Sequence, residues 1–123
     1  MTIADALNLV DTQKYNNFCT AEKISWLSEL ESQIYRELVA THEDAPASPF
    51  VPFTMDTPLD TVLFAPEPYD QVYLHQLEMK MDYYSGEIEK YLNSRALRSA
   101  FYDALRSWYN RSHLPKTASW RFP

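Results

Sequence analysis

Glycine is nearly absent from this chain of 123 residues and occurs only at position 86. Phosphate cradles, dinucleotide fingerprints and the nucleophile elbow all need glycines for tight turns and close ligand approach. The scarcity of glycine excludes those three kinds of site. Gly86 itself falls within a helical pattern, where glycine costs about 1 kcal/mol relative to alanine. We expect it either to permit a close approach or to be a tolerated surface residue.

Cysteine occurs only at Cys19, so the chain cannot form an intrachain disulfide. The N-terminus shows no secretion signal, and no stretch approaches the ~18 apolar residues of a membrane span. We therefore expect a cytosolic chain that does not cross a bilayer. Cys19 lies just before an expected helix, where a thiol can become nucleophilic, but the sequence shows neither a base nor a pocket beside it. A catalytic role for Cys19 is not expected.

Groupings typical of metal or catalytic sites are also lacking. His42, His75 and His113 lie far apart with no metal-ligand spacing, and the sequence His42-Glu43-Asp44 falls at the end of an expected helix. No serine, histidine and aspartate stand in a nucleophile context, although folding can assemble a triad that sequence does not reveal. We expect no catalytic residue, no cofactor and no metal site, and hence no enzyme. A small helical enzyme with a polar pocket remains an alternative.

Aromatic residues are abundant, with nine tyrosines, six phenylalanines and three tryptophans. Each large side chain contributes roughly 1.5–3 kcal/mol when fully buried, so a chain of this length can build one core without disulfides. The longest periodic pattern covers residues 69–92, where apolar side chains recur at steps of three or four. That stripe consists of Tyr73, Leu77, Met81, Tyr84, Ile88 and Tyr91.

Three further segments have helical signals. Residues 95–111 follow Asn93 and Ser94, which offer a side-chain oxygen as a cap. Thr2 and Thr20 are the expected caps of helices over residues 3–11 and 21–41. The sequence thus predicts an all-α fold, a small four-helix bundle-like domain over residues 1–116 with a C-terminal tail over residues 117–123.

The loop between the second and third helices, residues 43–68, contains six of the eight prolines. Proline disfavours helix, so this segment should be extended, with short strands near 50–54 and 61–64 as an option. Apolar residues are interleaved with the prolines and need cover. We expect the loop to lie across the helices or to pack against another chain.

Charge is distributed unevenly along the chain. Residues 1–93 hold 5 Lys and Arg against 16 Asp and Glu, a net of −11, whereas residues 94–123 hold 6 against 1, a net of +5. This asymmetry fits a head-to-tail contact between the basic end of one copy and the acidic body of the next. It also fits a basic surface for nucleic acid, with tyrosines as stacking platforms. The alternative function is therefore a small cytosolic nucleic-acid-binding or regulatory module that uses the Arg-rich last helix.

Several segments in a fixed order resemble a known family. These are Trp26 to Glu31, Ile34 to Glu37, Pro66 to Asp70, Asp82-Tyr83 and Gly86-Glu87 running to Tyr91 to Ser94, and Trp108 to Arg111. Together they resemble the small head-tail connector, or adaptor, proteins of tailed bacteriophages and prophages, over roughly residues 3–116. The tail after Lys116 matches no part of that pattern.

The resemblance implies a structural virion protein without enzymatic activity. It implies a homo-oligomeric ring, twelvefold on the portal protein, that extends the channel and presents a surface to a tail or stopper protein. DNA would pass through the channel without specific binding. The implied location is the virion neck, with the host cytoplasm as the place of assembly, and no membrane is involved. The interface residues that we expect from the apolar loop, the basic helix and the tail are Phe50, Val51, Phe53, Arg95, Arg98, Arg106, Arg111, Trp120 and Phe122.

Overall fold

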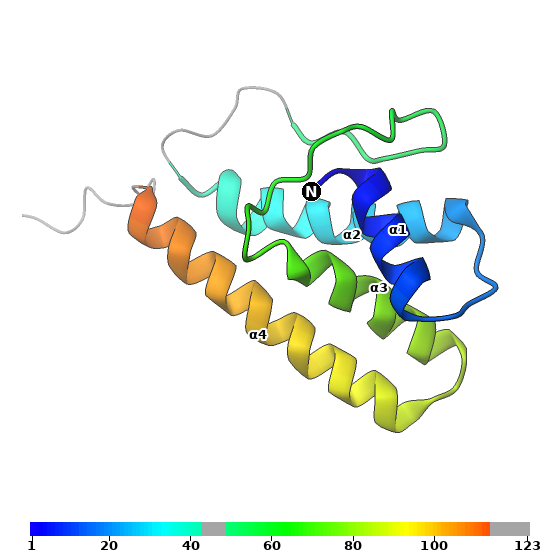
Figure 1. Ribbon diagram of the computed structural model, residues 1–123. Helices are drawn as coiled ribbons and strands as arrows, with labels where there is room; N and C mark the ends of the chain where they lie inside the picture. The colour runs from blue at the N-terminus through cyan, green and yellow to red at the C-terminus, as the bar shows by residue number, and fades with distance from the viewer. Residues whose placement is uncertain (43–48, 114–123) are drawn as a thin grey trace, which may run out of the picture.

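The computed structural model describes residues 1–42 and 49–113, which form an all-helical fold (Figure 1). In chain order the elements are α1 (Ile3–Gln13), α2 (Thr20–Ile34), the π-helical turn η1 (Tyr35–Val39), α3 (Gln71–Tyr84) and α4 (Ile88–Ser112). The described part of the chain contains no strand, and the expected short strands reduce to one isolated bridge between Thr2 and Val62. The prediction of a small all-α protein with four helices is confirmed.

The first two helices begin close to where the sequence places them. The hydroxyl of Thr2 accepts a hydrogen bond from the Asp5 amide at 3.1 Å, and the Asp5 carboxylate accepts one from the Thr2 amide at 3.0 Å. This reciprocal pair is a capping box. The second helix starts one residue earlier than expected, because Cys19 is the N-cap and its amide and thiol both donate to the carboxylate of Glu22.

The boundary between the last two helices differs from the prediction. The third helix ends at Tyr84 and the fourth begins at Ile88, so Asn93 and Ser94 lie inside α4 and do not cap it. Gly86 makes the turn, with a φ of 75°, a conformation that glycine adopts far more readily than residues with a Cβ. The expectation of a mid-helix glycine was therefore wrong.

This turn splits the apolar stripe that the sequence assigned to one helical face. Tyr73, Leu77 and Met81 are fully buried, whereas Tyr84 and Ile88 are each 60% exposed. The periodicity continues through the turn in sequence, but the chain reverses direction at Gly86, and the second half of the stripe leaves the core.

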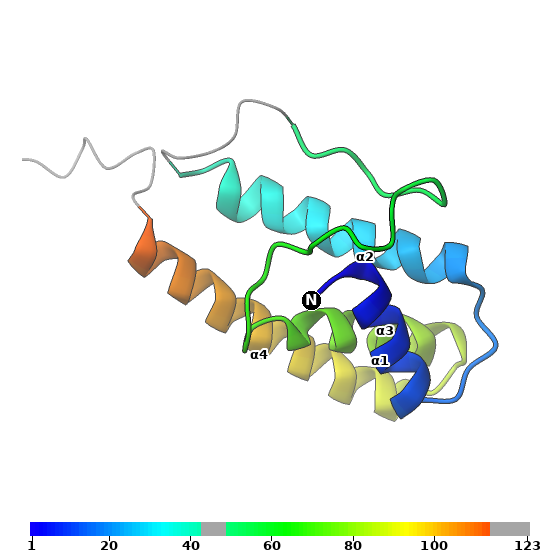
Figure 2. The same cartoon turned by 45° about the horizontal axis from the view of Figure 1, so that its top comes forward.

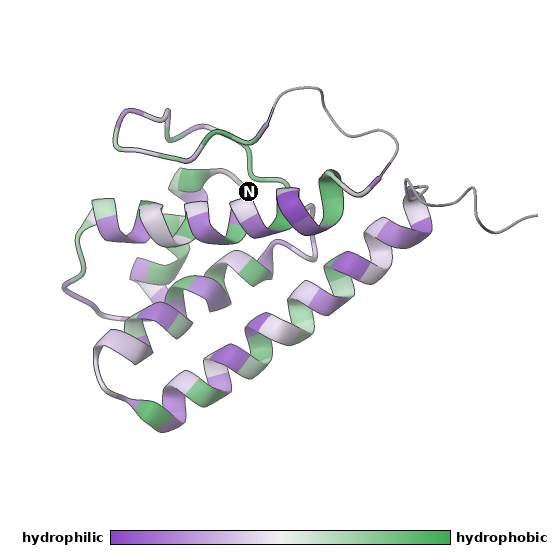
Figure 3. Ribbon diagram, turned by 180° about the vertical axis from the view of Figure 1, so that it is seen from behind, coloured by the Kyte–Doolittle hydropathy of each residue, from purple (hydrophilic) through white to green (hydrophobic). Residues whose placement is uncertain are grey.

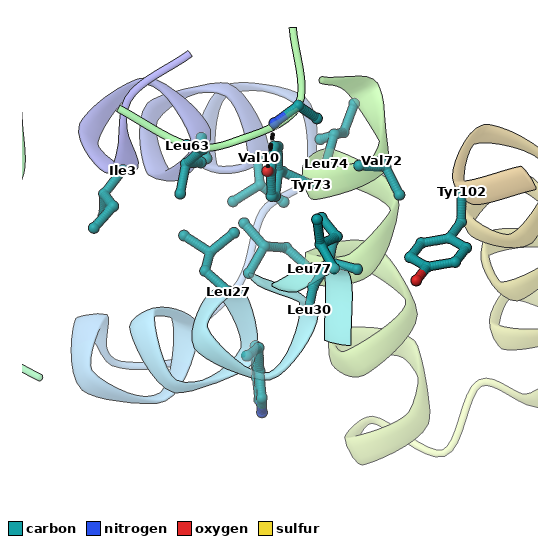
Figure 4. Close-up of a cluster of buried hydrophobic side chains, with 14 of the residues drawn as sticks. Ile3, Val10, Leu27, Leu30, Leu63, Val72, Tyr73, Leu74, Leu77 and Tyr102 are labelled. Atoms are coloured by element: carbon teal, nitrogen blue, oxygen red, sulfur yellow. Dashed lines mark hydrogen bonds between the residues drawn. The ribbon is translucent and has the colours of Figure 1, made fainter. Parts of the chain in front are cut away.

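The core lies where α1, α2 and α3 meet (Figure 4). Its largest fully buried side chains are Tyr73, Ile3, Leu27, Leu30, Ile34, Leu38, Leu77, Met81, Leu105, Gln76, Val10 and Val72. The fourth helix packs mainly along α3 and contributes Tyr102, Leu105 and Tyr109. Burial of this many large apolar side chains supplies most of the favourable free energy of folding.

Residues 49–68 lie across the helices, as Figure 2 shows beside α1 and α2. The amides of Ile3 and Ala4 donate to the carbonyls of Thr61 and Leu59 at 3.1 and 2.9 Å. The amide of Leu63 donates to the carbonyl of Met1 at 2.9 Å, and the Leu63 side chain enters the core. These bonds hold the crossing segment against the start of α1.

Candidate functional site

A groove opens between α2, η1 and the crossing segment, with a volume of about 330 Å³. Most of its wall is aromatic or aliphatic, and Glu31 is the one ionisable carboxylic acid in it. The lining residues are Glu31, Tyr35, Pro49, Phe50, Val51, Phe53, Thr61 and Val62. A concave, mainly apolar site with a single acid is suited to an apolar or cationic side chain.

The acid of the groove, Glu31, is 2% exposed and joins three segments. Its carboxylate accepts a hydrogen bond from the hydroxyl of Tyr73 at 2.6 Å and another from the amide of Phe64 at 2.8 Å. Burial raises the pKa of Glu31, and the two hydrogen bonds oppose that rise. The pKa of Tyr73 lies well above its ordinary value, because the ring is buried and faces Glu31.

Aromatic rings form a continuous row along the groove and beyond it. Phe53 contacts Phe50, and Phe50 contacts Tyr35, with ring centroids 5.3 and 5.1 Å apart. Tyr35 in turn contacts Phe64 at 5.9 Å, and Phe64 contacts Tyr109 of α4 at 5.3 Å. The π-helical turn begins at Tyr35 and so lies beside this row, in keeping with the frequent occurrence of such turns at functional positions.

A loop patch lies on the crossing segment, and two of its residues, Val51 and Val62, also line the groove. It consists of Val51, Met55, Leu59 and Val62, whose exposed fractions lie between 45% and 75%. Single exposed apolar residues are ordinary, but a set on one segment is typical of an interaction surface.

A second apolar surface, the hairpin patch, lies at the turn between α3 and α4. It consists of Tyr83, Tyr84, Ile88 and Leu92, each at least 53% exposed. Tyr84 stacks on Trp26 with a centroid distance of 5.8 Å, and Tyr83 contacts Tyr84 at 5.1 Å. Figure 3 shows hydrophobic colour at the start of α4, and Figures 1 and 2 place this turn away from the crossing segment, with α1 and α2 between them.

The arginines of α4 do not share one exposed surface. Arg98 is half-buried, and it donates to the side-chain oxygens of Gln76 at 2.8 Å and Gln33 at 2.6 Å. Burial lowers the pKa of its guanidinium. Arg106 pairs with Asp103 one helical turn away at 2.6 Å. Arg98 thus joins α4 to α2 and α3 inside one chain.

The remaining expected interface residues have different surroundings. Arg95 and Arg111 are exposed, Val51 is 75% exposed, and Phe50 and Phe53 are half-buried against their own chain. Trp120 and Phe122 lie outside the described residues.

Two of the three histidines lie near each other, because the rings of His42 and His113 have centroids 6.3 Å apart. The buried His42 contacts the carbonyl of Leu38 and lies 2.9 Å from the side-chain oxygen of Asn110, so it links η1 to α4. His75 pairs with Glu78 at 3.1 Å. No group of three or more metal-ligating side chains is present within residues 1–42 and 49–113.

A second cavity, of about 300 Å³, lies beside the connection between α1 and α2 and includes Lys14, Phe18 and Met81 in its wall. The Lys14 ammonium lies 2.6 Å from the carboxylate of Asp82, which is 1% exposed and also accepts a hydrogen bond from Ser94 at 2.8 Å. The ammonium of Lys14 therefore already pairs with a buried carboxylate. This cluster joins α1, α3 and α4.

Little in the sequence indicated two of these features, the hairpin patch and the position of Glu31. The hairpin patch belongs to a stripe with core periodicity, and only Gly86 hinted that the helix breaks there. The place of Glu31 beneath the groove had no local signal, because its partners Phe64 and Tyr73 are 33 and 42 residues away.

None of the helices in the described part of the chain combines the length and hydropathy of a membrane-spanning segment. Comparison with protein-family models, with curated proteins and with solved structures identified no match to this chain.

Proposed function

We propose that this protein is a structural subunit that assembles head to tail into a closed ring, as in the head-tail connectors that its sequence resembles. In this role it docks on the portal protein at the virion neck and presents a surface to a tail or stopper protein. It acts as an assembly component and not as an enzyme. The observation that carries the proposal is the presence of two separate apolar surfaces, the loop patch and the hairpin patch.

Two different patches suit heterologous contacts better than a twofold dimer. In a twofold dimer one patch meets its own copy, whereas in a ring each subunit uses one surface toward the neighbour ahead and another toward the neighbour behind. The loop patch and the hairpin patch lie apart, with α1 and α2 between them (Figure 1). That placement allows both to be used at once.

The charge distribution supports the same arrangement. The net charge of +5 on residues 94–123 and of −11 on residues 1–93 favours an approach of the basic end of one copy to the acidic body of another. Arg95 and Arg111 are exposed and therefore accessible to a neighbour. The commitment of Arg98 to Gln76 and Gln33 weighs against a nucleic-acid surface that needs all four arginines.

Sedimentation velocity over a concentration series tests the proposal, with the chain alone and mixed with a phage portal protein. One variant carries Ile88→Ser and Leu92→Ser in the hairpin patch, and another carries Val51→Ser and Val62→Ser in the loop patch. Tyr15→Ser is the matched control, because Tyr15 is 89% exposed outside both patches. We expect the wild type and the control to form oligomers and each double variant to stay monomeric.

Mixing the two double variants distinguishes head-to-tail assembly from other modes. Each variant keeps one intact surface, so a mixture should form a dimer through one native contact and stop there. A wild type that stays monomeric even with a portal protein would contradict the proposal. Patch variants that associate like the control would contradict it too.

A further inference from the structure

The residues that line the groove between α2, η1 and the crossing segment favour one kind of ligand. Its aromatic side chains are Tyr35, Phe50 and Phe53, and its one acidic lining residue, Glu31, is 2% exposed and bonded to Tyr73 and Phe64. Aromatic faces favour a guanidinium or ammonium group, since the ring quadrupole attracts a cation.

The crossing segment carries a negative net charge. Residues 49–68 include three acidic residues, Asp56, Asp60 and Glu67, and no lysine or arginine. A volume of about 330 Å³ lies near the lower end of the range of roughly 300–1,000 Å³ for ligand pockets, so one or two side chains fill it. The occupant is therefore a short segment with a cation and bulky apolar neighbours.

This chain has one segment of that chemistry. Among its 11 lysines and arginines, only Arg121 has an aromatic residue on each side, in Trp120-Arg121-Phe122. Residues 114–123 contain Lys116 and Arg121 and no acidic side chain. The described part of the chain ends at His113, which stacks on Tyr109 with centroids 3.8 Å apart, so ten residues follow the last turn of α4. At about 3.3 Å per extended residue, these ten can span roughly 30 Å.

We propose that the groove of one copy binds Trp120-Arg121-Phe122 of a neighbouring copy. Arg121 lies over the aromatic wall, and the flanking rings pack beside it in the groove. This inference rests on the proposed head-to-tail assembly and adds a second contact to the one between the loop patch and the hairpin patch. It joins the basic end of one subunit to the acidic body of the next.

Disulfide trapping tests the contact in full-length protein. In a Cys19→Ser background, one chain carries Val51→Cys and a second, of different mass, carries Phe122→Cys. We expect a disulfide-linked pair of the two chains on oxidation, and adding Arg121→Glu should reduce its yield about tenfold. Met55→Cys replaces Val51→Cys as the control, because Met55 is exposed on the same segment but does not line the groove. A yield no higher than that of the control would overturn the inference.

A chain that carries both Val51→Cys and Phe122→Cys shows whether the groove binds the tail of a neighbouring copy or the tail of its own chain. Links between copies give a ladder of multimers and support the inference. A link within one chain gives a compact monomer and overturns it, because the groove then holds its own tail.

Two further measurements separate this inference from the proposed function. If an Arg121→Glu chain sediments as oligomers like the wild type, the assembly stands and the groove contact fails. A labelled synthetic peptide of residues 114–123 measures the contact without assembly, by fluorescence anisotropy on the full chain. We expect binding that weakens about tenfold in a Phe50→Ala variant, and equal binding to that variant would overturn the inference.

Discussion

The hydroxyl of Tyr73 donates a 2.6 Å hydrogen bond to the carboxylate of Glu31. It also accepts one of 2.9 Å from the amide of Ala65, drawn as the dashed line in Figure 4. One oxygen atom thus joins α3, α2 and the crossing segment. Replacing Tyr73 with Phe should lower the free energy of unfolding by about 2–4 kcal/mol, because the Ala65 amide and one oxygen of the Glu31 carboxylate are left without partners in the core. Urea denaturation measures the loss. Tyr83→Phe, at an exposed position, is the control and should change stability by less than about 0.5 kcal/mol. Equal stability of the two variants would contradict this account.

The buried carboxyl of Glu31 should give the protein a distinctive pH dependence. Its pKa is raised from 4.5, so the folded state holds the proton more tightly than the unfolded state. The stabilisation is fully present below pH 4.5 and is lost as the pH rises through the raised pKa. Relative to Glu31→Gln, the wild type should therefore lose stability as the pH rises above 4.5.

Denaturation of both proteins over a pH series measures this difference. The pKa values of Asp5 and Glu37 are lowered by hydrogen bonds from Thr2 and Tyr102, so their contributions have the opposite sign. Those contributions are common to both proteins and cancel in the comparison. A difference that stays constant with pH would show that Glu31 titrates as it does in the unfolded chain.

Two arginines of one helix should respond differently to the same substitution. Arg98→Ala removes two hydrogen bonds, to Gln76 and Gln33, and should cost about 1–3 kcal/mol of stability. Arg95→Ala removes an exposed side chain and should stay within about 0.5 kcal/mol of the wild type. Thermal denaturation measured by circular dichroism compares them. Similar melting temperatures would mean that Arg98 is not a structural link.

A charge-reversal test of assembly should therefore use exposed arginines, whose replacement leaves the fold intact. We expect an Arg95→Glu, Arg111→Glu double variant to assemble more weakly than the wild type. Wild-type assembly itself should weaken as salt rises, through screening of the contacts between basic and acidic surfaces. Each exposed pair contributes only about 0–1 kcal/mol, so the change is a shift in the association constant.

Duplex DNA binding in dilute salt is the second readout. Wild-type DNA affinity that disappears in the variant, with assembly unchanged, would favour the nucleic-acid function.

At the Gly86 turn there is room for a side chain, but the backbone conformation is unfavourable for any residue with a Cβ. A Cβ at this position would meet no atom within 4 Å, yet the φ of 75° is unfavourable for alanine. Gly86→Ala should therefore cost about 1 kcal/mol, and Gly86→Asn less, since asparagine adopts this region more readily. Chemical denaturation of the two variants provides the comparison. A larger cost for asparagine would point to a steric cause.

Local patterns in the sequence predicted the helices and much of the core. Along α2 and η1, Ile24, Leu27, Leu30, Ile34 and Leu38 recur at steps of three or four, which is the spacing of one helical face, and all five are buried. Periodicity reports which residues share a helical face, but it does not report where a chain reverses. For that reason the break at Gly86 was missed.

The polar links between elements had no signal in local patterns. Gln33 and Arg98 are 65 residues apart, and neither side chain is of a type that signals burial. Glutamate is expected on a solvated surface, yet Glu31 is covered because the crossing segment supplies donors to it. Contacts of this kind depend on tertiary arrangement, which no pattern within a single helix encodes.

The pairing of residues 1–4 with residues 59–63 bears on how the chain folds during synthesis. The first helix leaves the ribosome early, but its amide partners at Leu59 and Thr61 emerge about sixty residues later. At about 5–20 residues per second, that interval lasts several seconds. During this time α1 is a short helix without the partners that hold its start, and such helices are marginal in isolation. Its docking must await the crossing segment, which makes this junction a late event in the maturation of the nascent chain.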